Sequence, residues 1–558
     1  MTDAESLWRT AYQHPGSWDQ AFAPMTLPEM FRTSVARMGD APMLDFLGRR
    51  YSYAHCAQAV DLVATGLHRL GVKPGDRVGL FLPNVPHYVA AYYGALAMGA
   101  VIVNYSPLYT VDELAAQVAD SGTTTLVTLS AAALLPTALK VMERGGVERL
   151  IVGSVAGVLP MAKAVLFRLF KRGEVTELPS DSRVTRFSAL IANDGGHSLP
   201  SVKPDDIAVL QYTGGTTGVP KGAMLTHQNL TANARQVDAV DPDRDADDRI
   251  VGVLPFFHVF ANTCVLNRTI LSGGMIAMLP RFDAKAALAT ISRVKATSLP
   301  GVPTMYQALL DHRDIGKTDF SSLRVCVSGG APLPAEVKAK FEAVSGSKVV
   351  EGYGLTESAG VVSTNPYEGL NKTGTIGQPL PATRVKLLDR EDPSRLAPDG
   401  EPGEIAFAGP QVMKGYWQRP EADAEVFVDG WLRTGDVGAI DEDGYIRIVD
   451  RLKDMIAVGG FKVFPSVIEA QLYAHDAVKE ALVIGIPDSY SGEKPKAFVT
   501  LAEGSHLDGD ALMAWLNPKV GKHERVVAVE VRDSLPKTLV GKLSRKELVA
   551  EEREKAGS

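Results

Sequence analysis

Cysteine is scarce in this sequence, and its three residues, Cys56, Cys264 and Cys326, lie far apart. They match neither the paired spacing of a zinc site nor a disulfide framework, so a reducing compartment is expected. A basic surplus is missing as well, since the formal net charge is −7 at pH 7, which argues against nucleic acid as a partner. The first residues are acidic and lack the basic-then-apolar order of a signal peptide. We therefore expect a cytoplasmic protein.

A long, unbroken apolar run is also absent. No Asp, Glu, Lys or Arg occurs from Gly79 to Val111, but Pro86 and Pro107 interrupt this stretch. A helix that crosses a bilayer needs about 20 consecutive apolar residues. The pattern therefore predicts a buried helix over roughly residues 86–98, followed by a strand at Ala100–Asn104.

A second stretch, Met161–Arg172, has an apolar side and a basic side when it is projected as a helix, although Phe167 falls on the basic side. The apolar side carries Val165, Leu166, Leu169 and Phe170, and the basic side carries Lys163, Arg168, Lys171 and Arg172. This pattern is typical of a helix that lies on an anionic membrane surface. It is equally typical of a surface helix that packs its apolar side on its own domain. The sequence leaves both interpretations open.

The order of predicted elements indicates an α/β fold with two domains. At 558 residues the chain exceeds the size at which a single core stops growing. Short apolar strands alternate with amphipathic helices over most of the chain, which predicts stacked, mostly parallel α/β subdomains. From Thr383 the strands become short and turn-rich, which predicts a small β-barrel-like element. After Arg451 a compact α+β unit follows, which includes a predicted strand at Arg525–Arg532. We predict domains at residues 1–452 and 453–558.

The segment Tyr212–Gly222 has the composition of a loop that wraps a polyphosphate. Glycines let backbone N–H groups converge on an anion, hydroxyls add donors, and a lysine adds charge. A Walker A loop would place Gly and Lys side by side, whereas Val219 and Pro220 separate them here. The alternative is a plain loop after the strand Ile207–Leu210. The candidate phosphate-binding residues are Thr213, Gly214, Gly215, Thr216, Thr217, Gly218 and Lys221.

Six further segments follow in a fixed order: Pro255–His258, Ser328–Pro332, Glu351–Glu357, Gly430–Asp436, Asp450–Ile456 and Leu535–Lys542. Together with the glycine-rich loop they resemble the motifs of the adenylate-forming (AMP-binding) superfamily, and the resemblance spans nearly the whole chain. Within it, the chain is most similar to bacterial long-chain fatty acyl-CoA synthetases. The segments that carry this likeness are Val103–Thr110, Gln211–Gln228, Asn365–Tyr367 and Gly374–Thr383.

The resemblance implies an ATP-dependent fatty acid–CoA ligase. The carboxylate of a medium- or long-chain fatty acid attacks the α-phosphate of ATP, giving an acyl-adenylate and pyrophosphate, and the coenzyme A thiol then displaces AMP. ATP, Mg²⁺ and coenzyme A are the expected cofactors and co-substrates. Expected partners are fatty acid, a membrane surface touched peripherally at the inner leaflet, and a second copy in a homodimer. The alternatives are an acyl- or aryl-AMP ligase, a CoA ligase for another carboxylic acid, and a non-catalytic nucleotide- or lipid-binding homologue.

The resemblance also implies roles for individual residues. Lys542 would be the catalytic lysine of adenylation, with Glu357, Thr213 and His258 as further catalytic residues, and Glu357 and Thr213 would bind Mg²⁺. Mg²⁺ prefers oxygen ligands and usually keeps phosphate and water in its shell. The remaining implied nucleotide-binding residues are Gly330, Ala331, Pro332, Gly352, Tyr353, Gly354, Thr356, Asp436 and Arg451.

Other residues would serve the acyl group and coenzyme A. The implied acyl-binding residues are Phe257, His258, Gly301, Val302, Gly329 and Gly354. Lys453 matches the family hinge about which a mobile C-terminal domain turns, and the coenzyme A channel would contain Gly459, Gly460 and Lys462.

Each of these assignments has a structural alternative. Glu357 could serve as a helix N-cap partner, and Asp436 with Arg451 as a surface ion pair. Histidine in an aromatic run, such as His258, is often a packed core residue, Tyr353 could be an ordinary turn tyrosine, and Lys542 a solvated lysine.

Overall fold

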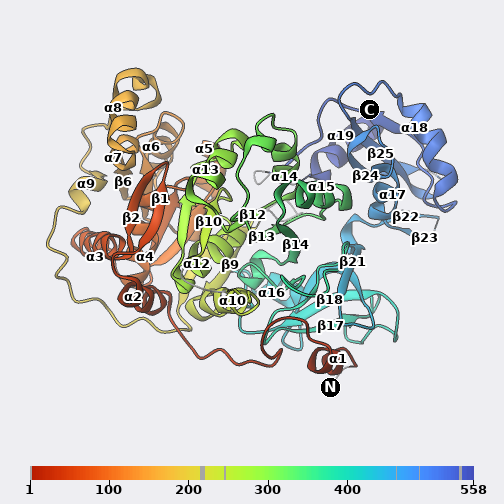
Figure 1. The fold of residues 1–558 in the computed structure, drawn as a ribbon, viewed down its shortest axis with the longest axis horizontal. Coiled ribbons are helices and arrows are strands. Elements are labelled where there is room, and N and C mark those ends of the chain that lie inside the picture. The colour runs from red at the N-terminus through yellow and green to blue at the C-terminus, as the bar shows by residue number, and fades with distance from the viewer. Residues whose placement is uncertain are drawn as a thin grey trace. The chain divides into compact units, whose positions relative to one another are not determined.

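The structure is a computed structural model that describes residues 3–213, 220–243, 247–459, 461–488, 490–538 and 543–557. The chain forms two compact units. The larger unit contains Glu5–Arg384 and Ala408–Val426, and the smaller unit contains Val385–Phe407 and Phe427 onwards together with the first four residues. Figure 1 labels their helices and strands from the N- to the C-terminus.

A seven-stranded sheet forms one part of the larger unit. All neighbouring strands are parallel except the last pair, β8 and β9, which form an antiparallel hairpin. In spatial order the strands are β7 (Val184–Arg186), β6 (Arg149–Gly153), β5 (Thr125–Leu129), β3 (Arg77–Phe81), β4 (Val101–Tyr105), β8 (Ile207–Thr213) and β9 (Lys221–Thr226). The helices of this region are α3 (Tyr53–Arg69), α4 (Pro86–Ala97), α5 (Val111–Ser121), α6 (Leu135–Glu143), α7 (Val155–Val158), α8 (Met161–Phe170), α9 (Phe187–Leu190) and α10 (His227–Ala239).

A nine-stranded sheet forms the other part, and it is parallel from β1 to β14 with antiparallel strands at both edges. Its order is β16 (Gln378–Pro379), β15 (Ser363–Thr364), β14 (Lys348–Tyr353), β13 (Val325–Gly329), β12 (Ser298–Gly301), β10 (Arg249–Gly252), β11 (Met275–Met278), β1 (Pro42–Phe46) and β2 (Arg49–Ser52). The other helices of the unit are α1 (Asp3–Thr10), α2 (Leu27–Met38), α11 (Val259–Ala261), α12 (Arg268–Ser272), α13 (Ala284–Val294), α14 (Pro303–Leu310), α15 (Ala335–Ser345) and α16 (Pro420–Val426).

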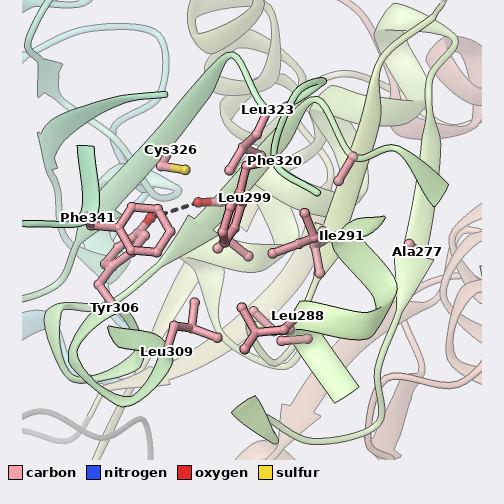
Figure 2. Close-up of a cluster of buried hydrophobic side chains, with 14 of the residues drawn as sticks. Ala277, Leu288, Ile291, Leu299, Tyr306, Leu309, Phe320, Leu323, Cys326 and Phe341 are labelled. Atoms are coloured by element: carbon pink, nitrogen blue, oxygen red, sulfur yellow. Dashed lines mark hydrogen bonds between the residues drawn. The ribbon is translucent and has the colours of Figure 1, made fainter. Parts of the chain in front are cut away.

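Apolar side chains from these helices and strands form the core of the nine-stranded region (Figure 2). Leu288 and Ile291 come from α13, Leu299 from β12, and Phe341 from α15. The Tyr306 hydroxyl donates to the carbonyl of Leu299 at 2.7 Å, so this ring is buried without an unpaired polar atom. Burial of this set fixes the strands whose carboxyl ends carry the predicted site.

The uncharged stretch is mostly buried from Gly79 to Ser106, as predicted for its helix, whereas Leu108 near its end is 65% exposed. Eleven of the twelve residues of α4 are buried, and so is every residue of β4. Among the residues that the structure describes, no helix has both the length and the apolarity that crossing a bilayer requires.

Helix α8 differs sharply from α4. Leu166, Leu169 and Phe170 are exposed by 54%, 57% and 76%, and Met161 by 85%. The interpretation that this helix packs its apolar side on its own domain is therefore wrong. In Figure 1, α8 lies next to α7 at the outer edge of the ribbon.

The smaller unit contains two sheets, of which the second is mixed because it includes one parallel pair, β25 and β26. The first has the order β17 (Arg384–Leu388), β18 (Gly403–Ala408), β20 (Trp431–Ile440) and β19 (Phe427–Val428), with β21 (Ile446–Arg451) paired to β20. The second has the order β23 (Phe461–Val463), β22 (Ile456–Val458), β25 (Gly492–Leu501) and β24 (Val478–Asp488), with β26 (Val529–Val531) parallel to β25. Its helices are α17 (Pro465–Tyr473), α18 (Gly509–Leu516) and α19 (Arg545–Gly557).

The predicted fold class, parallel α/β layers with a small antiparallel β element and a small α+β unit, is confirmed. One prediction was too long. The apolar pattern over 525–532 predicted a strand of that length, whereas only Val529–Val531 pairs with β25. Asn517 explains the difference, because its side chain accepts from the N–H of Val526 and donates to the carbonyl of the same residue, which occupies this backbone before the strand begins.

Candidate active site

The hairpin of β8 and β9 presents two candidate residues opposite each other. Thr213 ends β8, Lys221 begins β9, and the two are register partners. Both are partly buried. The predicted phosphate-binding residues between them, Gly214, Gly215, Thr216, Thr217 and Gly218, lie outside the described residues. The hairpin therefore places one hydroxyl and one ammonium at the two ends of the predicted phosphate loop.

The carboxyl ends of three parallel strands bring a second set of candidates together. Gly301 at the end of β12 pairs with Ser328 of β13, and Gly329 pairs with Gly352 of β14. Val302, Gly330, Ala331 and Pro332 follow these strand ends, and Tyr353 is the last residue of β14. Gly354 must be a glycine, since an added Cβ would lie 2.0 Å from the carbonyl oxygen of Gly360. Ligands of parallel α/β sheets bind at such strand ends.

Glu357 lies in a 3-10 turn, Thr356–Ser358, that follows β14 and contacts β8 and β9. Leu355 is the N-cap residue of this turn, and its backbone N–H donates to the hydroxyl of Ser358 at 3.0 Å. The N-cap role considered for Glu357 is therefore wrong. Its carboxylate instead accepts a hydrogen bond from the Tyr416 hydroxyl at 2.7 Å. The larger unit thus places Glu357 beside the hairpin of Thr213 and Lys221.

His258 lies between β10 and α11, next to this cluster. Its Nδ1 accepts from the backbone N–H of Phe260 at 3.3 Å, and the side chain is only partly buried, unlike the fully buried Phe256. The interpretation of His258 as a packed core residue therefore does not hold. The Gln211 side chain, near the end of β8, donates to the carbonyl of Phe257 at 2.9 Å. This hydrogen bond connects the segment that carries His258 to the β8–β9 hairpin.

Two residues at the site were not predicted from the sequence. Tyr416 is 59 positions from Glu357, and no local spacing connects them. Glu351 accepts the N–H of Leu333 at 3.3 Å, just after the Gly330–Pro332 segment, and burial raises the pKa of its carboxyl to about 7. A signal for Glu351 existed, because an acidic residue at the end of an apolar strand is uncommon.

The smaller unit carries the candidates for the ribose. Asp436 on β20 and Arg451 on β21 are register partners, and their side chains form an ion pair at 2.9 Å. The Asp436 side chain is 4% exposed whereas that of Arg451 is 51% exposed. The pair considered as an alternative therefore exists, but with a buried carboxylate. Glu404 supports the turn before Asp436, since it accepts the N–H of Gly435 at 3.0 Å and pairs with Arg433 at 2.7 Å.

The remaining candidates of the smaller unit lie at two other places. Lys453 is exposed in the 3-10 turn Leu452–Asp454 that follows β21. Gly459 follows β22 with a φ of 57°, in the left-handed region that favours glycine, and the Nζ of Lys462 on β23 lies 3.4 Å from the Glu391 carboxylate. Gly460 and Lys542 fall outside the described residues.

The donor set around Glu357 is compatible with Mg²⁺. Within the described part of the chain, no three His, Cys, Asp or Glu side chains cluster as a complete metal site. Mg²⁺ that arrives with a triphosphate needs no such cluster, because phosphate oxygens and water fill most of its shell. One carboxylate, Glu357, and one hydroxyl, Thr213, suit that mode of binding.

Comparison with known proteins places this geometry in a family context. A family model described as AMP-binding enzyme matches residues 31–417, and a second, described as AMP-binding enzyme C-terminal domain, matches residues 467–542. A long-chain-fatty-acid–CoA ligase of Bacillus subtilis strain 168 is 40% identical over 556 residues, which cover 99% of each chain.

Two solved structures share the fold. One is ATP-bound MatB from Rhodopseudomonas palustris, with a TM-score of 0.82, 29% identity, and coverage of 94% of this chain and 99% of that one. The other is the anthranilate CoA ligase AuaEII in complex with anthranoyl-AMP, with a TM-score of 0.85, 26% identity, and coverage of 97% and 100%. These likenesses confirm the fold predicted from the sequence.

Proposed function

The chain belongs to the family of AMP-binding enzymes, and from this premise we propose that it is an ATP-dependent ligase that converts medium- or long-chain fatty acids to acyl-CoA. In the first step a carboxylate oxygen attacks the α-phosphorus of ATP, the α–β phosphoanhydride bond breaks, and pyrophosphate leaves. In the second step the coenzyme A sulfur attacks the acyl carbon, and the bond to AMP breaks. The Bacillus relative, a long-chain-fatty-acid–CoA ligase, supports the fatty acid as substrate.

One observation carries the first step: Thr213 and Lys221 flank the loop that joins β8 to β9, and the turn that carries Glu357 contacts both strands. A fatty carboxylate is already ionised at neutral pH, so it needs relief from repulsion by the triphosphate rather than a strong base. Lys221 supplies positive charge, and Glu357 with Thr213 would hold Mg²⁺. When bound, Mg²⁺ neutralises phosphate charge and draws the oxygens into position.

The residues around the strand ends would bind the rest of the adenylate. We assign the phosphate loop to Gly214, Gly215, Thr216, Thr217 and Gly218, and the adenine side to Gly330, Ala331, Pro332, Gly352, Tyr353, Gly354 and Thr356. We assign the acyl group to Phe257, His258, Gly301, Val302, Gly329 and Gly354. An apolar tunnel is expected there, because each buried CH₂ contributes about 0.8 kcal/mol.

The smaller unit would contribute the remaining groups. Asp436 and Arg451 are assigned to the ribose, and Lys542 to the charge that redistributes during adenylation. We propose that residues 453–558 act as a mobile domain hinged at Lys453, and that Gly459, Gly460 and Lys462 serve coenzyme A once Lys542 has moved away. We propose that the chain works in the cytoplasm. We also propose that it forms a homodimer, and light scattering of the purified protein would test this.

Pyrophosphate release and thioester formation, measured over a panel of acids and acceptors, test the function. We expect both with palmitate and coenzyme A. Pyrophosphate release without thioester would indicate an acyl-AMP ligase, and a preference for aryl acids would favour an aryl-CoA ligase, similar to the anthranilate CoA ligase AuaEII. No release with any acid would support a non-catalytic homologue.

The variant Lys542→Ala separates the two steps. It should abolish pyrophosphate release and leave thioester formation from supplied acyl-adenylate largely intact, because the lysine serves only the first transition state. Equal loss of both steps would contradict the assignment.

We also propose that α8 docks the protein on an anionic membrane surface. Met161, Leu166, Leu169 and Phe170 expose their apolar side chains on this short helix. Lys163 and Lys171 are exposed in the same segment. The Lys163 ammonium donates to the carbonyl of Leu47, and Lys171 forms an ion pair with Glu174. Apolar side chains enter the acyl boundary while lysines meet anionic headgroups, and a ligase for poorly soluble fatty acids would gain substrate there.

Vesicle sedimentation tests this docking. Lys163→Ser/Lys171→Ser should weaken binding to vesicles that contain anionic phospholipid about thirtyfold at low salt, since each basic residue near such a surface contributes about 1 kcal/mol. Lys317→Ser/Lys340→Ser is the matched control, because these lysines are exposed, carry the same charge and pair with Asp314 and Glu336. Equal sedimentation of both double variants would contradict the proposal.

A further inference from the structure

A short extended segment, Met413–Trp417, runs along the open edge of β9. The N–H of Met224 donates to the carbonyl of Gly415 at 2.8 Å, and that of Lys414 donates to the carbonyl of Met224 at 2.9 Å. Trp417 donates to the carbonyl of Gly222 at 2.8 Å. The segment therefore extends the hairpin that carries Lys221, and Tyr416 lies opposite Ala223 as an antiparallel bridge partner.

The same segment is tied to the turn that carries Glu357. The N–H of Met413 donates to the carbonyl of Glu357 at 2.8 Å. The N–H of Tyr416 donates to Oδ1 of Asp423 at 2.7 Å. Gly415 fits beside this carboxylate only because it lacks a Cβ, which would lie 2.6 Å from Asp423, and its φ is 139°. The backbone of Tyr416 is thus fixed from both sides.

The Tyr416 side chain contacts both charged candidates of the larger unit. Its hydroxyl donates to Oε1 of Glu357 at 2.7 Å, and the Nζ of Lys221 lies 5.3 Å from the centre of its ring. The residue is only 6% exposed. A tyrosine phenol ordinarily has a pKa of about 10, so the hydroxyl is a neutral donor at pH 7. An ammonium over an aromatic face is attracted by the ring quadrupole.

We infer that Tyr416 is a positioning residue for adenylation, whose hydroxyl orients the Glu357 carboxylate toward Mg·ATP while its ring holds the Lys221 ammonium at the mouth of the hairpin. The inference rests on the proposed function and deepens it. A carboxylate with one oxygen held by a neutral donor keeps its full negative charge for a cation. The Lys221 ammonium lies over the Tyr416 ring and forms its ion pair with Glu425, at 3.8 Å, rather than with Glu357.

Two variants separate the hydroxyl from the ring. Tyr416→Phe keeps the ring, so calorimetry in EDTA should show unchanged binding of ATP. The gain in ATP affinity on adding Mg²⁺ should fall about tenfold, and the Mg²⁺ concentration that half-saturates pyrophosphate release should rise similarly, because a hydrogen bond to a charged group is lost. Tyr416→Leu should also weaken ATP binding in EDTA, by about two- to fivefold, since the contact between Lys221 and the ring is gone.

Tyr53→Phe is the matched control. Tyr53 is also buried, and its hydroxyl donates to the carbonyl of Gly274 at 2.8 Å, in a different part of the unit. This variant should lower the melting temperature as much as Tyr416→Phe and leave the Mg²⁺ dependence of ATP binding unchanged. Thioester formation from supplied acyl-adenylate should be normal in both variants.

Equal Mg²⁺ dependence of ATP binding in wild type and Tyr416→Phe would overturn the inference, as would an equal change in Tyr53→Phe. Calorimetry also keeps the two proposals apart. If the wild type binds Mg·ATP yet releases no pyrophosphate with any acid, the proposed ligase activity fails while the role of Tyr416 at Mg·ATP is still tested.

Discussion

Two candidate carboxylates, Glu357 in the larger unit and Asp436 in the smaller one, are held in opposite ways. Glu357 is partly buried and accepts from a neutral phenol at 2.7 Å. Asp436 is buried and faces the guanidinium of Arg451 at 2.9 Å. A neutral donor orients a carboxylate without cancelling its charge, which suits a ligand for a cation. An arginine cancels the charge and leaves lone pairs for neutral hydroxyl donors, which suits a ribose.

The largest expected effect that tests this contrast belongs to Glu357→Gln. The amide keeps the shape and an acceptor for Tyr416 but loses the charge, so the rate of pyrophosphate release at saturating Mg·ATP should fall by about 10²–10³-fold, the usual loss when one electrostatic group of an active site is removed. Quenched single-turnover assays would measure it. A larger fall in Asp436→Asn than in Glu357→Gln would reverse the comparison.

A third carboxylate, Glu351, extends the contrast to a buried group for which the cost of burial outweighs the attraction of the nearby Lys338. Burial raises the pKa of its carboxyl to about 7 from an ordinary value of 4.5. The unfolded chain therefore loses this proton between about pH 4.5 and 7 while the folded chain keeps it. Across that window, folding stability is present at low pH and is lost as pH rises.

The change should reach at most about 3 kcal/mol, from the difference between the two pKa values. Urea unfolding of wild type and Glu351→Gln at pH 5 and pH 7.5 would isolate it, because glutamine still accepts from Leu333 but does not titrate. The wild type should lose stability relative to the variant at the higher pH. Parallel pH profiles would mean that Glu351 is ionised throughout.

Asp436→Asn should have a smaller effect that appears in binding. We expect the KM for ATP to rise about tenfold, the scale of one hydrogen bond to a charged group, with little change in kcat. The nucleotide 2′-deoxy-ATP supplies the control, since it lacks one ribose hydroxyl. The variant should discriminate less between ATP and 2′-deoxy-ATP than the wild type, and unchanged discrimination would place the ribose elsewhere.

Much of the fold could be predicted from the sequence, because strand and helix periods are local. The charge-free stretch around α4 was predicted as a buried helix followed by a strand, and the structure has both. Helix α8 was predicted as amphipathic, but the sequence left its surroundings open because exposure depends on what packs against a helix, which no local pattern records.

The site shows the same limit. Thr213 and Lys221 were predicted from the composition of the glycine-rich loop and Glu357 through motif resemblance, and the larger unit brings their segments together. Tyr416 and Glu351 were missed, because their importance comes from contacts across the sheet edge and between neighbouring strands. Such contacts join residues that are distant in sequence. An acidic residue in an apolar strand marks Glu351 in the sequence, but the partners of both residues are seen only in the fold.

Arg451→Gln tests the other side of the comparison and should have the smallest effect. The Arg451 side chain is 51% exposed, so water and salt screen most of its attraction for Asp436, and such pairs contribute at most about 1 kcal/mol. The KM for ATP should rise only two- to fivefold by that scale, and less at 0.5 M salt than at 0.05 M salt. Steady-state kinetics at the two salt concentrations would measure this.

If Arg451→Gln instead raised the KM more than Asp436→Asn at both concentrations, the guanidinium rather than the carboxylate would be the main contact with the ribose. The buried Asp436 would then serve chiefly to orient Arg451. The rule that the partner of a carboxylate indicates its ligand would then hold for Glu357 but not for Asp436.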